Sequence, residues 1–536
     1  MQRNLFLGVE AIGQAAIDAG ISGVYAYPGT PSTEITEYIQ INKAATERNI
    51  HRQWSANEKT AMETALGMSY AGKRTMTCMK HVGLNVAADV YMNAAITGVN
   101  GGMVVAVADD PSQHSSQNEQ DSRFYGKFAQ LPVFEPSNQQ EAYDMTYEAF
   151  EFSEKTGLPV MIRITTRLAH SRAGVVQKDL QKEKSLKLPE NLMQFMLLPA
   201  YGRKYYQNLL DKQGRLEELS NDSKYNQYYE GIDKSLGIVC CGIAFNYLME
   251  NYSNDDCHYP IVKVTQYPAP KKLLKRLEEE CDEILVIEEG YPLVEELLTD
   301  YFEKGTRIHG RLNGALPRRG ELNPTLVAKA LGRSVESSFS VPETIVNRPP
   351  SLCAGCGHQD TYYALNEVIK EYGDGRVFSD IGCYTLGALP PYNTINTCVD
   401  MGASITMAKG AADAGLTPVF AVIGDSTFTH SGITGLLDCV YEKTNINILI
   451  VDNEAVAMTG GQDSSAKGKI ESICKGIGVD PKHIRLYVPL KKHHDEIVQI
   501  IKEEIEYEGV SIIIGRRTCI QKISRIKKEN KMQNHN

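Results

Sequence analysis

Residues Gly424–Gln462 read GDSTFTHSGITGLLDCVYEKTNINILIVDNEAVAMTGGQ, and this stretch decides the fold around it. An apolar strand at residues 419–423 precedes it, a helix-compatible segment follows, and a second apolar strand spans residues 446–451. This order predicts a βαβ unit. Asp425 and Asn453 then follow the carboxyl ends of its two strands, where open α/β sheets bind their ligands.

Asp425 and Asn453 offer oxygen to a hard cation such as Mg²⁺, which normally keeps a phosphate among its ligands. A diphosphate cofactor therefore fits this edge. A Gly-Asp pair alone is equally explained as an ordinary acid at a strand end. Together with the spaced Asp-Asn pair and Thr459–Gln462, however, it resembles the thiamine diphosphate motif, and its GDS variant resembles the 2-oxoacid:ferredoxin oxidoreductase family. The resemblance implies a multidomain α/β thiamine diphosphate-binding fold, with parallel sheets flanked by helices.

The resemblance also assigns cofactor-binding residues one by one. Asp425 and Asn453 match the side-chain ligands of Mg²⁺, and Ala455 matches the residue that gives its backbone carbonyl. Ser426 stands where the wider motif has glycine. The remaining matches, at the first strand end and in the segment that closes over the diphosphate, are Gly424, Thr459, Gly460, Gly461 and Gln462.

Length and composition predict an ordinary globular chain of several domains. A chain of 536 residues predicts about three domains, and 42% hydrophobic residues allow an extensive core. The formal net charge of -10 and the lack of any nucleic-acid motif argue against a nucleic-acid partner. No apolar run approaches the roughly twenty residues of a membrane span, and the first residues lack a signal-peptide core. We expect a soluble, cytoplasmic protein.

Composition and the resemblance together predict a series of domains. A Lys-, Glu-, Asn- and Tyr-rich stretch with few strand signals separates two α/β regions, and prolines near 349 lead into a third. The expected divisions are a pyrimidine-binding domain at 1–185, a partly helical linker at 186–235, a transketolase-C-like α/β domain at 236–335, a diphosphate-binding domain at 345–521 and a basic polar tail at 522–536.

The first domain contains a turn, Pro28–Ser32, between a short strand and a helix. Two prolines and a glycine fix its backbone and leave two hydroxyls available as caps or ligands. A helix cap is a sufficient explanation for Ser32. Thr30 lies in a segment, YPGTPS, that resembles the family's YPxTPS turn, and the resemblance implies that its side chain faces the 2-oxoacid.

Glu58 falls in the first turn of a predicted helix. A carboxylate there is explained by its favourable interaction with the helix dipole. The resemblance implies a catalytic role instead, because thiamine diphosphate enzymes carry a glutamate at the start of this helix. That carboxyl protonates the pyrimidine N1′ of the cofactor and so makes the 4′-amino group a base.

Lys80 and His81 join a strand to an alanine-rich helix at the cleft edge of the first sheet. They are candidates for holding a substrate carboxylate or transferring a proton, although such a pair at a strand end is also typical of a solvated terminus. The polar stretch Asp109–Glu119 has no periodicity and is interpreted as an active-site loop or lid.

The chain has twelve cysteines, too few for a disulfide framework at this length without a signal peptide. Cys353 and Cys356 form a CxxC pair, which suits zinc, an iron–sulfur cluster or a redox dithiol. Cys383 and Cys519 follow predicted strand ends and so are expected to reach the same sheet edge. Four thiolates suit zinc or a [4Fe–4S] cluster, and the pattern resembles the cluster ligands of the oxidoreductase family. The other eight are interpreted as structural thiols, because reduced Cys usually behaves as a small hydrophobe.

The segments NEK, MKHVGLNVAAD, RPPSLCAGCGH and GDSTF with TGGQ resemble the alpha subunits of indolepyruvate:ferredoxin oxidoreductases over residues 5 to 520. The resemblance implies oxidative decarboxylation of an aryl 2-oxoacid with CoA, with electrons passed to ferredoxin. It implies a beta subunit with a gamma-type domain, in a dimer of heterodimers. The chain here ends in a basic tail where that subunit commonly continues into a ferredoxin module, so we expect electrons to leave through the cysteine-bound cluster or a partner.

Two other functions fit the same fold. A non-oxidative thiamine diphosphate-dependent 2-oxoacid decarboxylase would need no cluster. A non-catalytic electron-transfer or scaffold subunit would retain the fold without turnover.

Overall fold

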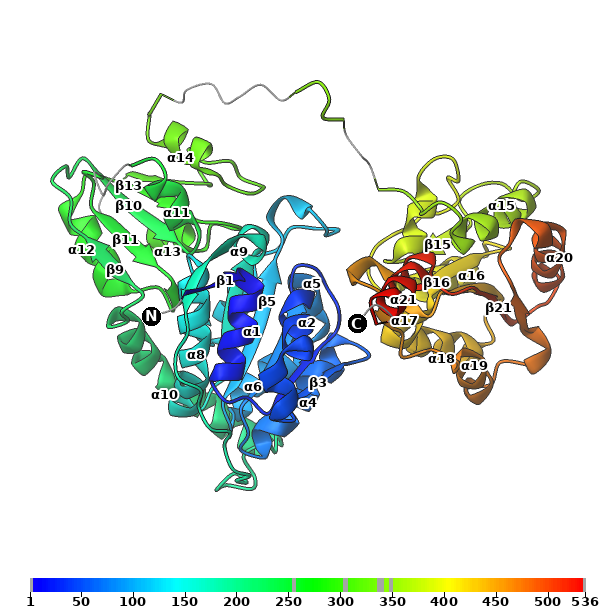
Figure 1. Cartoon of the computed structure of the whole chain (residues 1–536), viewed down its shortest axis with the longest axis horizontal. Coiled ribbons are helices and arrows are strands. Elements are labelled where there is room, and N and C mark those ends of the chain that lie inside the picture. The colour runs from blue at the N-terminus through cyan, green and yellow to red at the C-terminus, as the bar shows by residue number, and fades with distance from the viewer. Residues whose placement is uncertain (1–2, 253–256, 302–306, 335–341, 347–349, 534–536) are drawn as a thin grey trace. The chain divides into compact units, whose positions relative to one another are not determined.

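The computed structural model describes residues 3–252, 257–301, 307–334, 342–346 and 350–533. The chain divides into two units, Met1–Phe339 and Ser340–Asn536, each with its own sheets and its own apolar core (Figure 1). The predicted boundary between 335 and 345, and the segment around Pro349, lie partly outside the described residues.

A seven-stranded sheet forms the centre of the first unit. All neighbouring strands are parallel except β12, which pairs antiparallel with β6 at one edge. Every residue of β4, β5 and β7 is buried, as expected for a parallel sheet covered on both faces. The strand order is β12 (Gln266–Tyr267), β6 (Val133–Phe134), β7 (Val160–Thr165), β5 (Met103–Asp109), β4 (Thr75–Lys80), β2 (Gly23–Ala26) and β3 (His51–Trp54).

Helices cover this sheet through their apolar faces. The first helix, α1, lies beside α8 (Figure 1), and its residues Val9, Ile12 and Ala16 are fully buried in the core that the two helices share. A short antiparallel pair, β1 (Arg3–Leu7) and β8 (Arg172–Val176), lies beside it. The helices of this region are α1 (Gly8–Asp18), α2 (Thr33–Ile41), α3 (Lys43–Glu47), α4 (Glu58–Tyr70), α5 (His81–Val86), α6 (Ala88–Thr97), α7 (Arg123–Ala129), α8 (Gln139–Thr156), α9 (Thr166–His170) and α10 (Pro199–Asn221).

A five-stranded sheet follows in the same unit, in the region where an α/β domain was predicted. Strand β12 leaves this region and pairs with β6, so the two sheets of the unit are joined by main-chain hydrogen bonds. The strand order is β14 (Arg307–His309), β13 (Glu283–Ile287), β10 (Leu236–Cys241), β11 (Ile261–Val264) and β9 (Gln227–Tyr229). Its helices are α11 (Ala244–Met249), α12 (Lys271–Glu280), α13 (Leu293–Tyr301) and α14 (Pro324–Ala330).

A buried cluster of ion pairs also joins the two sheets. The guanidinium of Arg163 lies 2.7 Å from Asp109 and contacts Glu135, and that of Arg123 lies 3.0 Å from Glu288. These five side chains are almost completely excluded from solvent. Losing one partner of such a pair would leave a buried charge uncompensated, which typically costs about 3–5 kcal/mol. The cluster therefore fixes the two sheets relative to each other within this unit.

The second unit contains the predicted βαβ arrangement. Its sheet is entirely parallel, in the order β15 (Val377–Ser379), β16 (Phe420–Gly424), β17 (Ile446–Asp452), β21 (Val510–Arg516) and β20 (Ile484–Tyr487). The connection from β16 to β17 is helical as expected, with a π-helical turn at Phe428–Gly432. Its helices are α15 (Gly357–Ile369), α16 (Ala403–Asp413), α17 (Asp425–Thr427), α18 (Ile433–Glu442), α19 (Ile470–Ile477), α20 (His494–Ile505) and α21 (Ile520–Gln533).

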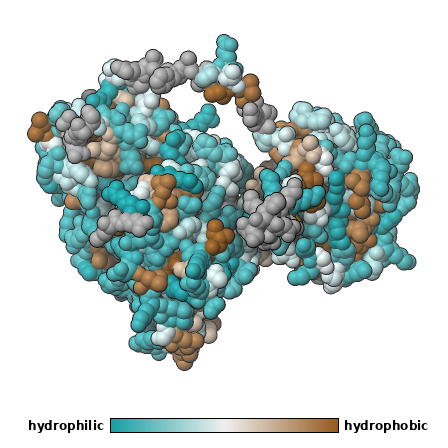
Figure 2. All heavy atoms as spheres, viewed as in Figure 1, coloured by the Kyte–Doolittle hydropathy of each residue, from teal (hydrophilic) through white to brown (hydrophobic). Residues whose placement is uncertain are grey.

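The segment expected to be a basic tail folds as helix α21, and the expected linker contains the long helix α10. Figure 2 shows that the visible surface of both units is mostly hydrophilic, with apolar residues in small groups. Within the described residues, no helix combines the length and apolarity that a membrane crossing requires.

Candidate functional site

The cofactor residues predicted in the second unit do meet at one sheet edge. Strands β16 and β17 are parallel neighbours, with Gly424 paired to Val451. Asp425 begins the helical turn directly after β16, and Asn453 comes directly after β17. Since both strands end at the same edge, their first loop residues face the same space beyond the sheet.

The carboxyl group of Asp425 is buried, but not all of its hydrogen-bonding capacity is used within the described residues. Its side chain is 2% exposed, and its Oδ2 atom has no hydrogen-bond partner among the described residues. Burial, with a smaller contribution from the nearby Asp452 carboxylate, raises the pKa of Asp425 to about 7, and hydrogen bonds from Ser464 and the Asn453 backbone oppose the rise. A bound cation would reverse this penalty, so the site fits the expected Mg²⁺.

The segment predicted to close over a diphosphate forms a compact turn. Ala455 lies in the short strand β18 (Ala455–Val456), which pairs with β19 (Gln462–Asp463). The Thr459 hydroxyl donates to Gln462 Oε1 at 2.8 Å, and Gln462 Nε2 donates to the Thr459 carbonyl at 2.8 Å. Between them, Gly460 and Gly461 have φ of 128° and 83°, which favours glycine. The Gly461 N–H donates to the Val456 carbonyl at 3.0 Å, so the turn is closed by its own hydrogen bonds.

Beside Gly424 lies a buried acid that sequence reasoning did not identify as part of the site. Asp380, at the end of β15, accepts hydrogen bonds from the hydroxyls of Tyr384 and Ser404 and from the Gly402 backbone at 3.2 Å. Burial raises the pKa of Asp380 to about 7, although these hydrogen bonds lower it. A Cβ on Gly424 would lie 2.5 Å from the Tyr384 ring, so the ring also explains why the motif begins with glycine. The only sequence signal was an acid at a strand end beside Gly382-Cys383.

The four singled-out cysteines line one pocket, as predicted. The cavity has a volume of about 100 Å³, and Asn453 is part of its lining. The backbone N–H of Cys519 donates to the Asn453 carbonyl at 3.0 Å, and Gln521 Nε2 lies 3.4 Å from Cys353 Sγ. The cysteine pocket therefore borders the predicted Mg²⁺ edge within the same unit.

The thiols of this pocket influence one another electrostatically. Burial raises the pKa of Cys383 to about 12, and the neighbouring Cys519, Cys356 and Cys353 contribute to the rise. Thiolate donors in one pocket suit zinc or an iron–sulfur cluster. In the described part of the chain, however, no group of three or more His, Cys, Asp or Glu side chains is already arranged to hold a metal ion.

Glu58 occupies the predicted position in the first unit, as the first residue of α4. The cap is supplied by Asn57, whose side chain accepts from Thr60 N at 2.8 Å. Glu58 itself is only 5% exposed, and a Cβ on Gly83 would lie 2.5 Å from its Oε1 atom. The interaction of an acid with the helix dipole does not require the acid to be buried. The missing side chain of Gly83 in α5 leaves the space that the Glu58 carboxyl occupies.

Lys80 is not a solvated strand terminus, because its side chain is buried at the end of β4. Its Nζ donates to the Ser115 carbonyl at 2.6 Å, and the Ser115 hydroxyl donates to the Thr30 carbonyl at 3.3 Å. Burial lowers the pKa of Lys80 to about 8, against the opposing effect of Asp110. The predicted loop after β5 thus brings Thr30 and Lys80 together at the carboxyl edge of the seven-stranded sheet.

His81 is also buried, which again excludes a solvated terminus. Its side chain is 1% exposed and faces Asn118, yet neither ring nitrogen forms a hydrogen bond with a described residue. Burial lowers the pKa of His81, so the ring is neutral at neutral pH.

The expected capping role of Ser32 is wrong: its hydroxyl donates to the Gly29 carbonyl at 2.6 Å and makes no capping bond to α2.

Two families match parts of the chain that contain these residues. Residues 14–201 match the family described as pyruvate flavodoxin/ferredoxin oxidoreductase, thiamine diphosphate-binding. Residues 380–514 match the family described as thiamine pyrophosphate enzyme, C-terminal TPP-binding domain. The first match includes Thr30, Glu58, Lys80 and His81, and the second includes the whole Gly424–Gln462 stretch.

Curated relatives align over nearly the whole chain. Indolepyruvate oxidoreductase subunit IorA of Archaeoglobus fulgidus is 38% identical over 97% of this chain and 86% of its own length. The subunits of the same name from Pyrococcus abyssi and Thermococcus kodakarensis are 38% and 37% identical, over 99% and 97% of this chain and 88% and 86% of their own lengths.

A solved structure shares the fold at low sequence identity. The 2-oxoglutarate:ferredoxin oxidoreductase from Magnetococcus marinus superposes with a TM-score of 0.50 at 15% identity, covering 62% of this chain and 65% of that chain. The likeness supports the expected α/β thiamine diphosphate-binding fold.

Proposed function

The chain belongs to the family of the IorA subunits of indolepyruvate oxidoreductases, and on that premise we propose that it is the catalytic subunit of a thiamine diphosphate-dependent enzyme that oxidatively decarboxylates aryl 2-oxoacids. The products are an aryl-acetyl-CoA and CO2, and the electrons reduce ferredoxin. The observation that carries the proposal is the buried carboxyl of Asp425, whose Oδ2 has no partner in the described chain, beside Asn453 at one sheet edge.

Asp425 and Asn453 would hold Mg²⁺ through their side chains, and Ala455 through its backbone carbonyl. Thr459, Gly460, Gly461 and Gln462 would close over the diphosphate, with Gly424 and Ser426 at its other side. The dication offsets the cost of burying the Asp425 carboxylate, and the diphosphate would be a further ligand of the same cation. Asp380, through Tyr384, would hold the Gly424 end of this site in place.

When bound, thiamine diphosphate supplies the nucleophilic carbon and the electron sink that cleavage beside a keto group requires. The protein's part in that step falls to Glu58, which holds a proton at N1′ of the pyrimidine. Burial suits this role, because a carboxyl shielded from water exchanges its proton with the ring it contacts rather than with bulk solvent.

Lys80, His81 and Thr30 would bind the 2-oxoacid. The Lys80 ammonium uses one N–H on the Ser115 carbonyl and has others left for a carboxylate. The neutral His81 ring offers one donor and one acceptor for a proton transfer at the reacting carbon. The Thr30 hydroxyl would orient the keto oxygen.

Cys353, Cys356, Cys383 and Cys519 would hold one [4Fe–4S] cluster that passes electrons one at a time to ferredoxin. The proposal is supported by their shared pocket and by the hydrogen bond from the Cys519 backbone to the Asn453 carbonyl. A beta subunit with a gamma-type domain would complete the enzyme as a dimer of heterodimers.

A substrate panel on the anaerobically purified complex of both subunits tests the proposed class. We expect kcat/KM for indolepyruvate and phenylpyruvate to exceed that for pyruvate and 2-oxoglutarate by more than tenfold, with a viologen dye as electron acceptor. CO2 release without dye reduction would instead indicate a non-oxidative decarboxylase. Absence of turnover with every 2-oxoacid, in protein that has bound thiamine diphosphate, would leave the scaffold role.

A further inference from the structure

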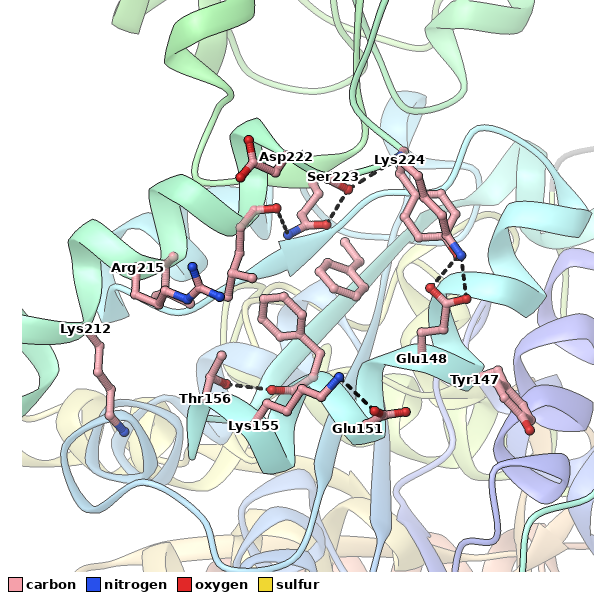
Figure 3. A pocket seen from close by; sticks show the side chains of 16 residues that line it. Tyr147, Glu148, Glu151, Lys155, Thr156, Lys212, Arg215, Asp222, Ser223 and Lys224 are labelled. Carbon is pink, nitrogen blue, oxygen red and sulfur yellow. Dashed lines mark hydrogen bonds and ion pairs between the residues drawn. The ribbon is translucent and has the colours of Figure 1, made fainter.

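A pocket of about 920 Å³ lies in the first unit, away from all the residues assigned above. It lies between helices α8 and α10, with Phe134 of β6 and Gln266 of β12 among its lining residues (Figure 3). Side chains at positions 148, 152 and 155 of α8 and 212, 216 and 219 of α10 line it, a spacing that places each set on one helix face. Neighbouring helices usually fill such a space with their own side chains. The volume is that of a small-molecule site.

Aromatic and aliphatic side chains form the interior of this pocket. Phe134 and Phe152 meet edge to face, with ring centroids 5.2 Å apart at 72°. Leu216 and Leu219 contribute from α10, and the Tyr225 ring contributes from the loop that follows it. A flat aromatic ring would gain both apolar burial and a preferred ring geometry against Phe152.

The acids of the pocket are already paired with cations. Glu148 accepts from Lys224 Nζ at 2.7 Å and from the Tyr225 hydroxyl at 2.9 Å, and Glu151 pairs with Lys155 at 2.8 Å. Their negative charge is therefore compensated from within the protein, and they would not repel an anionic ligand strongly.

Among the cationic side chains of the pocket, Lys212 is the one that is not paired with an acid in the described chain. Its ammonium forms no ion pair with a carboxylate of the described chain, and its hydrogen bond to the Gly157 carbonyl is long, at 3.4 Å. Figure 3 shows Lys212 and Arg215 at one end of the pocket, and Glu148 and Lys224 at the opposite end. An uncompensated, half-buried ammonium beside an apolar cavity is an anchor for an anion.

We propose that this pocket binds an aromatic anion, with the ring against Phe152 and the anionic group on Lys212, beside the ion pair of Arg215 with Glu218. Two sources carry this chemistry: an aryl carboxylate and a nucleotide, whose base and phosphate are likewise a flat ring and an anion. The inference does not depend on the proposed function, because none of its residues takes part in the thiamine diphosphate site.

Calorimetric titration of the purified complex, without thiamine diphosphate or Mg²⁺, tests the proposal with phenylacetate and adenosine monophosphate as probes. We expect one of them to bind, and the probe that binds identifies the source. Lys212→Met should raise its Kd about tenfold, the usual effect of losing a charged hydrogen bond, and Lys212→Arg should restore it. Phe152→Leu should raise the Kd severalfold through loss of the ring contact.

Lys204→Met is the matched control, because Lys204 is an exposed residue of α10 outside the pocket. Its Kd should equal that of the wild type. The proposal is overturned if neither probe binds, or if the Kd is unchanged in Lys212→Met. A lowered Tm of Lys212→Met with unchanged binding would show that Lys212 only stabilises the carboxyl end of α8. Binding that is lost in Asp425→Ala but kept in Lys212→Met would place the probe at the cofactor site.

Discussion

Replacing Gly83 by alanine tests whether the position of the Glu58 carboxyl matters for catalysis. The added methyl carbon would lie 2.5 Å from Glu58 Oε1, 2.7 Å from its Cγ and 2.9 Å from its Cδ. Ordinary contacts begin near 3.5 Å, so the carboxyl has to move by about 1 Å. A displacement of that size in a reacting group typically costs on the order of 10²-fold in rate, equivalent to about 2.7 kcal/mol.

The assay compares kcat for 2-oxoacid-dependent viologen reduction, and the rate of deuterium exchange at C2 of bound thiamine diphosphate. We expect both to fall about 10²-fold, with little change in the Kd for the cofactor, whose diphosphate ligands lie in the other unit. Overpacking lowers stability by roughly 1–3 kcal/mol, partly offset by the better helix propensity of alanine in α5.

Gly67→Ala is the matched control for this substitution. Gly67 lies in α4 with Glu58, and a Cβ there has no neighbour within 4 Å. Its activity should equal that of the wild type. Wild-type kcat and exchange rate in a folded Gly83→Ala protein would refute the placement of Glu58 at the pyrimidine.

Three other substitutions test separate parts of the account. Asp425→Ala should abolish Mg²⁺-dependent binding of thiamine diphosphate, measured by calorimetry, because the diphosphate would then lack a metal ligand; unchanged affinity would contradict this. Cys519→Ala should bleach most of the iron–sulfur absorbance of anaerobic protein and stop acceptor reduction, while the decarboxylation half-reaction survives in a single turnover; wild-type protein without iron, or with one zinc per chain, would exclude the cluster. Burial raises the pKa of Glu289 from 4.5 to about 8, so its contribution to stability is fully present below pH 4.5 and is lost as the pH rises through 8. The free energy of unfolding of Glu289→Gln should therefore rise by a few kcal/mol relative to that of the wild type between pH 5 and 8. If urea unfolding shows the same pH dependence for both proteins, Glu289 is not a buried neutral acid.

The features that could be predicted from the sequence were those that depend on residues close together in the chain. The apolar runs at 419–423 and 446–451 predicted β16 and β17 to within one residue, because a fully buried parallel strand needs an unbroken apolar sequence. Asp425 and Asn453 followed from those strand ends. Glu58 was placed correctly at the start of α4, although its burial was not visible in a charged, helix-forming sequence.

What sequence could not supply were contacts between distant residues. The hydrogen bonds on Asp380 come from Tyr384, Gly402 and Ser404, and only the folded chain brings the last two to it. Likewise, nothing in the sequence near Lys80 indicates that its ammonium is held by the Ser115 carbonyl, 35 residues away. The role of Ser32 was mispredicted for a related reason, because its hydroxyl donates to the Gly29 carbonyl of the turn and accepts no hydrogen bond from the first N–H groups of α2.

The buried ion-pair cluster was also invisible from sequence. Arg163 lies in the middle of an apolar strand, where a charged residue argues against burial unless its partners are known. Those partners are Asp109, at the end of β5, and Glu135, which follows β6, and both are far from Arg163 in the sequence. Patterns of periodicity identify which residues are buried, but compensation of a buried charge depends on tertiary structure.

The most direct test of the central claim is an omission experiment on the anaerobically purified complex. Reduction of viologen by indolepyruvate is measured with thiamine diphosphate, Mg²⁺ and CoA, and then with each left out in turn. The account predicts that reduction requires all three, and that Asp425→Ala reproduces the loss seen without Mg²⁺. Reduction that proceeds at the full rate without thiamine diphosphate, or CO2 release over many turnovers in the absence of both CoA and viologen, would contradict this prediction.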